Sequence, residues 1–323
     1  MPYLRPISPS DLGQLIWLAE HFPPGFTSLP KSPAHLAKKL EGTLHHTVGT
    51  PQQIAMGQRV LLGLFDDADD RLIGISGFQR TLTASAHYLQ QPDGTLRLDR
   101  QPLGEIRLGS LFLHPEWRRR GLAPLLSRAR LLYLALHWPE MQILYADLRG
   151  PTRNGGDQPA FWTKVSAHFY PHDFCQMDQI RGEDEAHFIH HYLPLADIPR
   201  QALDPELISQ LGNAAADARG AMHLLLEEGF VRSNRVDVLD GGPSLIGKLS
   251  ALKAVREAKT FTLYNKLQND AAPRFLIAHG RGEHFRACLC QGEAQGQNLL
   301  CSPEVTEYLA LGSDAQVIAT PSS

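Results

Sequence analysis

The chain has 323 residues, with 31 Lys and Arg against 34 Asp and Glu, so its formal net charge is −3. Hydrophobic residues make up 43% of it, which excludes a disordered chain, and the near-neutral charge excludes a protein that coats nucleic acid. The N-terminus lacks the apolar core of a signal peptide, the longest apolar stretch is far shorter than a membrane span, and cysteines are few. We therefore expect a cytoplasmic protein of about two domains, without a membrane or nucleic acid as partner.

Taken in chain order, apolar periodicity and turn residues predict alternating strands and helices up to about residue 245. Strands are expected at 3–7, 60–65, 72–78, 106–113, 142–148 and 230–239. Helices are expected at 12–19, 33–44, 121–136, 157–168, 204–210 and 214–228. After a short helix at 249–258, strands are expected at 261–266, 274–279, 285–290 and 316–319. This pattern predicts an α/β domain over residues 1–245 and a small β-rich C-terminal domain over residues 246–323.

The cysteines and histidines do not predict a metal site. Cys288 and Cys290 are separated by one residue, so they are expected on the same face of a strand, and no second pair at matching spacing completes a zinc site. His187 and His191 have the i,i+4 spacing of helical metal ligands, but we predict a strand for the stretch that holds them. No metal is therefore expected.

The most informative segment is an Arg-rich turn between a strand and a helix. The apolar residues 111–113 lead through Arg118–Arg120 to Gly121 and Ala123, where an amphipathic helix begins. Small residues let a ligand approach the backbone, the first N–H groups of the helix have no intrahelical partner, and the arginines add positive charge. The pattern indicates an anion site suited to a pyrophosphate, and a solvated basic helix start is the alternative.

The Arg-x-x-Gly-x-Ala pattern resembles the acyl-CoA-binding turn of the Gcn5-related N-acetyltransferase superfamily. Further segments, in order and spacing, resemble bacterial arginine N-succinyltransferase, a family of arginine catabolism. These segments are Thr27–Pro30, Ser110–Leu113, Trp117–Arg118, Ala146–Gly150, Phe161–Trp162, Glu228–Phe230 and Asp240–Pro243. The resemblance implies an α/β fold with a mixed sheet flanked by helices and a small C-terminal β domain. It also implies succinyl-CoA or another acyl-CoA as co-substrate, the α-amine of arginine or ornithine as acceptor, and a homodimer or a hetero-oligomer with a paralogue.

The resemblance also implies where the substrates bind. In the superfamily a splayed strand presents backbone N–H groups to the thioester, and here that strand would be 107–113. The predicted acyl-CoA contacts are Leu111, Phe112, Leu113, Arg118, Arg119, Arg120, Gly121, Leu122 and Ala123. The amine would enter near Arg107, Asp147 and His191. His191 and Tyr170 are the candidate catalytic residues, Tyr170 as the donor of a proton to the leaving thiolate, and packing in the core is the alternative for Tyr170.

The sequence departs from the family at positions that matter for chemistry. The family's catalytic His is replaced by Gly212, which cannot transfer a proton, and the next histidine, His223, is expected in the middle of a helix. Arg107 and His191 stand where the family has Glu, and residues 151–156 lack its acidic pair. Because a guanidinium and an ammonium group need carboxylates, these changes indicate a different acceptor or no catalysis, unless the positions lie outside the pocket. Two hypotheses follow: an N-acyltransferase with an altered acceptor, or an inactive CoA-ester-binding or regulatory subunit that pairs with an active paralogue.

Overall fold

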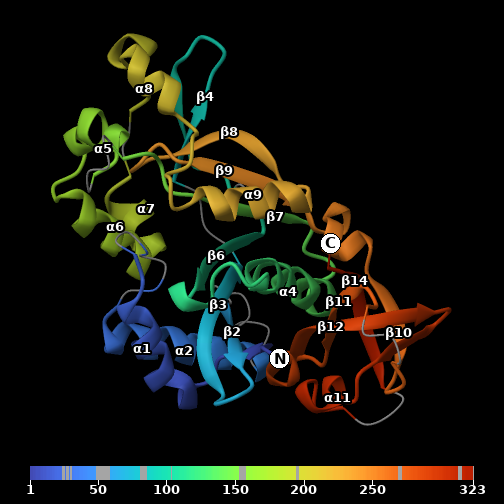
Figure 1. Cartoon of the computed structure of the whole chain (residues 1–323). Helices are drawn as coiled ribbons and strands as arrows, with labels where there is room; N and C mark the ends of the chain where they lie inside the picture. Colours follow the sequence, from blue (N-terminus) through green and yellow to red (C-terminus); the bar gives the residue numbers. More distant parts are fainter. Residues whose placement is uncertain are drawn as a thin grey trace.

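A computed structural model of the chain describes residues 1–23, 26, 29, 31–48, 59–80, 86–102, 104–152, 158–193, 196–267, 271–311 and 315–322. The described strands form one mixed sheet in the order β11-β14-β10-β13-β12-β1-β2-β3-β6-β7-β9-β8-β4-β5 (Figure 1). Their bounds are β1 Tyr3–Pro6, β2 Arg59–Asp66, β3 Arg71–Arg80, β4 His87–Gln90, β5 Leu96–Asp99, β6 Ile106–Leu113, β7 Ile143–Asp147, β8 Val231–Asp237, β9 Pro243–Lys248, β10 Lys259–Tyr264, β11 Arg274–His279, β12 Arg286–Gln295, β13 Asn298–Cys301 and β14 Gln316–Pro321.

Helices cover both faces of the N-terminal part of this sheet. The helices are α1 Leu12–Glu20, α2 Pro33–Val48, α4 Leu122–His137, α5 Ala160–Lys164, α6 Phe174–Glu183, α7 Glu185–His191, α8 Pro205–Gln210, α9 Arg219–Glu228, α10 Lys253–Arg256 and α11 Glu304–Tyr308. α1 and α2 pack on β2 and β3 from one side, and α4 packs on β3 and β6 from the other. Within the described part of the chain, no helix is long and apolar enough to cross a membrane.

Strand alternation explains why β2 is apolar along nearly its whole length. Leu62 and Leu64 point into the core cluster that contains α4, whereas Leu61 and Phe65 point into the cluster that contains α1 and α2. Because both faces of the strand are covered, both sets of side chains must be apolar. The mixed sheet flanked by helices that the resemblance implied is confirmed.

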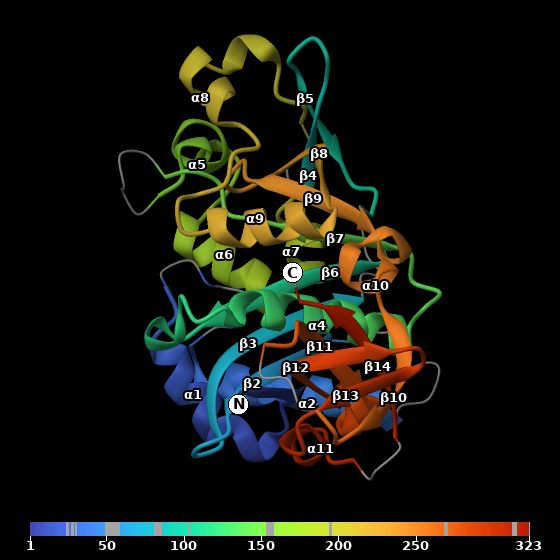
Figure 2. The same ribbon diagram turned by 45° about the vertical axis from the view of Figure 1, so that its right-hand side comes forward.

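The C-terminal strands continue the main sheet. β11 pairs with both β14 and β12, so β10 to β14 close into a ring, and β12 also pairs with β1. Figure 2 shows these strands at the same end of the molecule as α1 and α2, while α5, α8, β4 and β5 lie at the opposite end. Cys288 and Cys290 are both buried in one C-terminal cluster, which confirms that they share a face of their strand. The predicted domain boundary between residues 245 and 246 falls inside β9, which pairs with β7 and β8.

Three predicted elements differ in the structure. The stretch that holds His187 and His191 is the helix α7 and not a strand, because the Asp184 side chain caps it by accepting the backbone N–H of His187 at 2.9 Å. The helix predicted at 214–228 begins only at Arg219, and the one predicted at 157–168 is the short α5 followed by a 3-10 turn. β9 was not predicted at all. Thr27, Ser28 and Pro30 of the family-like segment, like residues 153–156, lie outside the described residues.

Candidate active site

β6 and β7 run parallel and then part. Arg107 pairs with Tyr145 and Leu108 with Ala146, and the register between the two strands ends there. On its other edge β6 pairs with β3 through an irregularity that places Ser110 and Leu111 opposite the single residue Ser76. Ser110 has a φ of +52°, in the left-handed region. Such a bulge bends the strand and turns backbone groups out of the ladder, and here it does so where the two strands separate.

The predicted pyrophosphate turn lies at the N-terminus of α4. Arg119 and Gly121 have φ values of +63° and +74°, and no side chain caps the helix. Arg118 stabilises the turn, because its Nε donates a hydrogen bond to the Leu113 carbonyl at 3.1 Å. Arg118 through Gly121 are exposed, while Leu122 is buried. The turn therefore offers the backbone N–H groups of a helix start together with exposed arginines, as an anion requires.

A buried ionic network lies beside Arg107, on the side of the sheet covered by α6 and α7. Arg107 Nη1 lies 2.5 Å from Glu185 Oε1 of α7, and the Nε of Arg181 on α6 lies 3.6 Å from the same oxygen. Arg181 also forms an ion pair with Asp237 at the end of β8. Side-chain caps by Asp173 and Asp184 start α6 and α7 and thereby hold Arg181 and Glu185 near each other across the helix junction.

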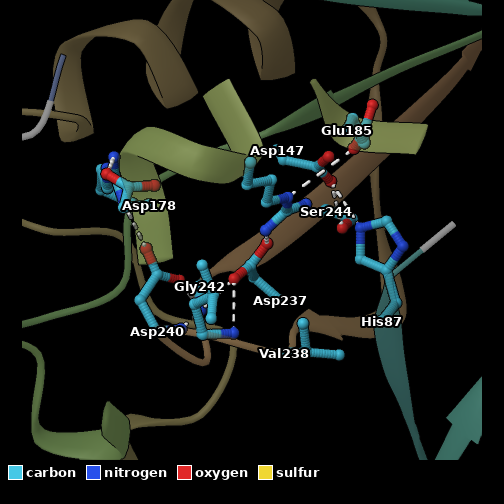
Figure 3. A network of polar contacts seen from close by, with 12 residues as sticks. His87, Asp147, Asp178, Glu185, Asp237, Val238, Asp240, Gly242 and Ser244 are labelled. Carbon is cyan, nitrogen blue, oxygen red and sulfur yellow. Dashed lines mark hydrogen bonds and ion pairs between the residues drawn. The ribbon is translucent and has the colours of Figure 1, made fainter. Parts of the chain in front are cut away.

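A histidine and a carboxylate meet where β7 ends (Figure 3). His87 Nε2 lies 2.9 Å from Asp147 Oδ1, and the hydroxyl of Ser244 donates to the same oxygen at 2.6 Å. His87 is only 2% exposed, and its Nδ1 has no hydrogen-bond partner among the described residues. Burial raises the pKa of Asp147, but its close contact with His87 and the charges of Arg107 and Arg181 outweigh burial and hold that pKa well below its usual range. Asp147 is thus an ionised carboxylate that orients the imidazole.

A second carboxylate group lies next to this network. Arg149 forms an ion pair with Asp178 and lies 3.5 Å from Asp240. Burial and the nearby charge of Asp237 raise the pKa of Asp240 to about 7. Asp240 also accepts the backbone N–H of Gly242 at 2.8 Å, so its place is set by the tight turn between β8 and β9.

The structure brings some of the predicted site residues together and separates others. Arg107 and Asp147 belong to one network, in which the charge of Asp147 helps to raise the pKa of Arg107 and the charge of Arg107 helps to lower that of Asp147. Tyr170 is buried between the rings of Trp162 and Phe188, at centroid distances of 5.6 and 5.8 Å, and its hydroxyl has no partner among the described residues. Burial is the main cause that raises the pKa of Tyr170. The charge of Asp237 raises this pKa further, and the charge of Arg181 lowers it. Its catalytic role stays a prediction.

His191 lies outside the network. It is exposed at the end of α7, where its ring lies 4.4 Å from that of His187 and 4.6 Å from that of His190. Its catalytic role likewise stays a prediction. His223 lies in the middle of α9 as expected, with its side chain 71% exposed and paired with Glu227. In the described part of the chain, no three His, Cys, Asp or Glu side chains are grouped so that they could hold a metal ion.

Gly212 lies near β4, the strand that carries His87. Its φ is +70°, and its N–H donates to the Gly241 carbonyl at 3.0 Å. A Cβ added there would lie 3.4 Å from Gln90 Nε2, an ordinary contact in terms of space. A side chain at this position would therefore face the strand that supplies the imidazole of the network.

Sequence reasoning missed His87, Arg181, Glu185 and Asp237. Arg181 and Glu185 carry a local signal, since opposite charges four residues apart often pair. His87 carries none, because its partner Asp147 is 60 residues away and the two meet only through the sheet.

Comparisons with known proteins identify the family of this chain. A family model described as "Arginine N-succinyltransferase beta subunit" matches residues 78–254, more than half of the chain. A second, described as the C-terminal domain of that subunit, matches residues 265–321.

Individual relatives match over nearly the whole chain. Arginine N-succinyltransferase of Yersinia pseudotuberculosis is 27% identical, and the alignment covers 99% of this chain and 98% of the relative. Arginine N-succinyltransferase subunit beta of Pseudomonas aeruginosa is 28% identical with the same coverage. The solved structure of arginine/ornithine succinyltransferase subunit AI from Pseudomonas aeruginosa superposes with a TM-score of 0.84 at 23% identity, covering 100% of this chain and 99% of that one. This structural likeness shows a shared fold.

Proposed function

The chain belongs to the arginine N-succinyltransferase beta subunit family, and we propose that it transfers an acyl group from an acyl-CoA thioester to an amine. The main observation behind the proposal is that β6 separates from β7 next to the bulge that β6 makes against β3. The Arg-rich start of α4 follows shortly after this bulge along the chain. By analogy with its relatives, succinyl-CoA is the proposed donor and arginine or ornithine the first acceptor to test.

The donor would lie along the outer half of β6. Its pyrophosphate would meet the exposed Arg119 and Arg120 and the first backbone N–H groups of α4. Its thioester would lie beside the bulge at Ser110 and Leu111, where backbone groups turned out of the ladder can stabilise the charge that develops on the carbonyl oxygen.

The acceptor amine must lose a proton before it attacks, and His87 is our candidate base. Asp147 holds His87 Nε2, which leaves Nδ1 to accept a proton, and the ionised Asp147 stabilises the imidazolium that results. This role would compensate for the missing histidine at Gly212. The departing thiolate also needs a proton, and Tyr170 remains the candidate donor.

A second function deserves a direct test because Gly212 offers no proton-transferring side chain. In it the chain is an inactive subunit that binds a CoA ester and acts within a complex with an active paralogue. Two of its relatives are named as subunits, which supports an assembly, either a homodimer or a hetero-oligomer.

The test is release of free thiol from succinyl-CoA in the presence of an amine panel, with the acylated product identified by mass spectrometry. Turnover with any amine supports the enzyme, and tight acyl-CoA binding without turnover supports the inactive subunit. His87→Gln should lower kcat by at least about a hundredfold, as expected for loss of a general base. His137→Gln is the matched control, because His137 is a half-buried histidine of α4 outside the network. Full activity of His87→Gln would remove His87 from the mechanism.

A further inference from the structure

Three neighbouring strands carry a row of polar side chains next to the proposed site. The register pairs Arg59 of β2 with Gln79 of β3, and Gln79 with Arg107 of β6. Residues directly opposite each other point to the same face, so the two arginines share one face with their Cα atoms about 10 Å apart, two strand spacings. Arg59 Nη2 donates to Gln79 Oε1 at 2.5 Å.

Helix α2 adds a third basic side chain to this face. Lys39 Nζ donates to the Gly182 carbonyl at 2.8 Å, near the junction of α6 and α7 where Arg107 meets Glu185. Burial, together with the positive charges of Arg59 and Arg107, lowers the pKa of Lys39 to about 6, although Glu183 and Glu185 oppose the shift. Lys39 is therefore mostly unprotonated near pH 7, and an anion bound beside it would favour its protonated form.

Most carboxylates near this face are already paired with cations of the chain, and Glu183 lies 3.4 Å from His35. Asp147 is held by His87, Glu185 by Arg107 and Arg181, and Asp237 by Arg181. Asp178 and Asp240 are held by Arg149. An arriving guanidinium would have to displace one of these internal cations. Arg59, by contrast, makes no ion pair with any described residue, and its hydrogen bond goes to a neutral amide.

The backbone between these basic side chains and the bulge is open to close approach at Gly109. Gly109 lies two residues after Arg107 on β6, so it belongs to the same face. A Cβ added at Gly109 would meet no described atom within 4 Å. An acceptor lying over Gly109 would span the distance from Arg107 to the bulge at Ser110, where the thioester is proposed to lie.

We propose that Arg59, Arg107 and Lys39 bind a side-chain carboxylate of the amine acceptor, so that the acceptor is an acidic amino acid and not arginine. This inference rests on the proposed acyltransferase function. The ligand group of this site is an aliphatic carboxylate. Either the side chain of the acceptor or the distal end of the donor's succinyl group could supply it, and the experiment below distinguishes these two sources.

Initial rates are measured with L-glutamate and L-aspartate against their neutral isosteres L-glutamine and L-asparagine, and against arginine and ornithine. Each acceptor is paired with succinyl-CoA and with butyryl-CoA, which lacks the distal carboxylate. An acidic acceptor should exceed its isostere in kcat/KM by about tenfold or more, because hydrogen bonds from charged groups are the strong ones. Arg59→Gln should remove this preference mainly through KM, and Arg59→Lys should keep part of it. Arg5→Gln, which removes the partly buried Arg5–Asp11 pair at β1, should leave the preference unchanged.

Two results would overturn the inference. One is arginine or ornithine as the best acceptor of the unmodified protein. The other is an Arg59→Gln variant that weakens succinyl-CoA relative to butyryl-CoA while the acceptor preference stays the same, because the carboxylate would then come from the donor. If no pair releases thiol, calorimetric titration of glutamate and glutamine into the protein saturated with acyl-CoA decides the matter. If the protein binds glutamate more tightly than glutamine and Arg59→Gln removes this difference, the carboxylate site is supported although the proposed activity fails. Equal binding of the two amino acids contradicts the carboxylate site.

Discussion

Replacing Arg181 by Met tests whether the buried network holds the site together. The Arg181 side chain is 11% exposed and serves two buried carboxylates, those of Asp237 and Glu185. Glu185 keeps Arg107 in the variant, but Asp237 is left buried without a cation. Breaking a buried pair in this way costs ~3–5 kcal/mol of unfolding free energy, and methionine fills much of the space that the arginine stem occupied. We expect a loss in that range near pH 7.5.

The loss should also depend on pH. Burial raises the pKa of Asp237, and Arg181 outweighs it, so in the unmodified protein that pKa lies below its ordinary value. The ion pair therefore stabilises the fold above the ordinary pKa of aspartate, and this contribution is lost as the pH falls through the lowered pKa. Without Arg181, burial raises the pKa of Asp237, so the variant gains stability from proton uptake as the pH falls. Both effects shrink the difference between the two proteins in acid.

Urea denaturation followed by circular dichroism, at pH 7.5 and at pH 5, measures the difference. Arg181→Met combined with Asp237→Asn should recover part of the loss, because no buried charge is then left alone. Arg256→Met is the exposed control and should change stability by less than about 0.5 kcal/mol, since its side chain is 59% exposed. A loss below about 1 kcal/mol at pH 7.5, or one that does not shrink at pH 5, would refute this account of the network.

Three further predictions concern other parts of the molecule. Lys39→Met should raise the melting temperature most below about pH 6 and progressively less toward pH 10.5. The reason is that the pKa of Lys39 is about 6 in the folded protein, so this lysine takes up a proton on unfolding between those two pH values. An equal rise in melting temperature at every pH would contradict the lowered pKa. Replacing both Arg119 and Arg120 by Ala should raise the calorimetric Kd for acyl-CoA about tenfold at low salt and less at high salt, whereas unchanged binding would exclude the turn as the pyrophosphate site. Gly242→Ala should prevent folding, seen as loss of soluble protein with a cooperative transition, because its Cβ would lie 2.0 Å from the Leu148 carbonyl oxygen; Gly220→Ala, where a Cβ meets nothing within 4 Å, should fold normally.

The proposed acyl-CoA end of the site was predictable because its signals are local. A strand, a turn with arginines and a glycine, and an amphipathic helix follow one another within about thirty residues, and each has a short-range pattern that backbone sterics and helix capping impose. The structure places β6, Gly121 and α4 where this pattern predicts them. The replacement of a family Glu by Arg107 was equally visible in the sequence, although its consequence was not.

The proposed acceptor end depends on contacts between residues far apart in the chain. His87 and Asp147 meet because β4 and β7 both belong to the part of the sheet built around β8 and β9, and β9 itself was not predicted. The histidine-rich stretch forms α7 and not a strand because capping by Asp184 and the burial of Phe188 override its weak local pattern. Arg107 pairs with Glu185, which lies 78 residues away in the chain, only because these layers pack against each other. Local patterns carry no information on such pairings, since burial and charge compensation arise only when the layers close.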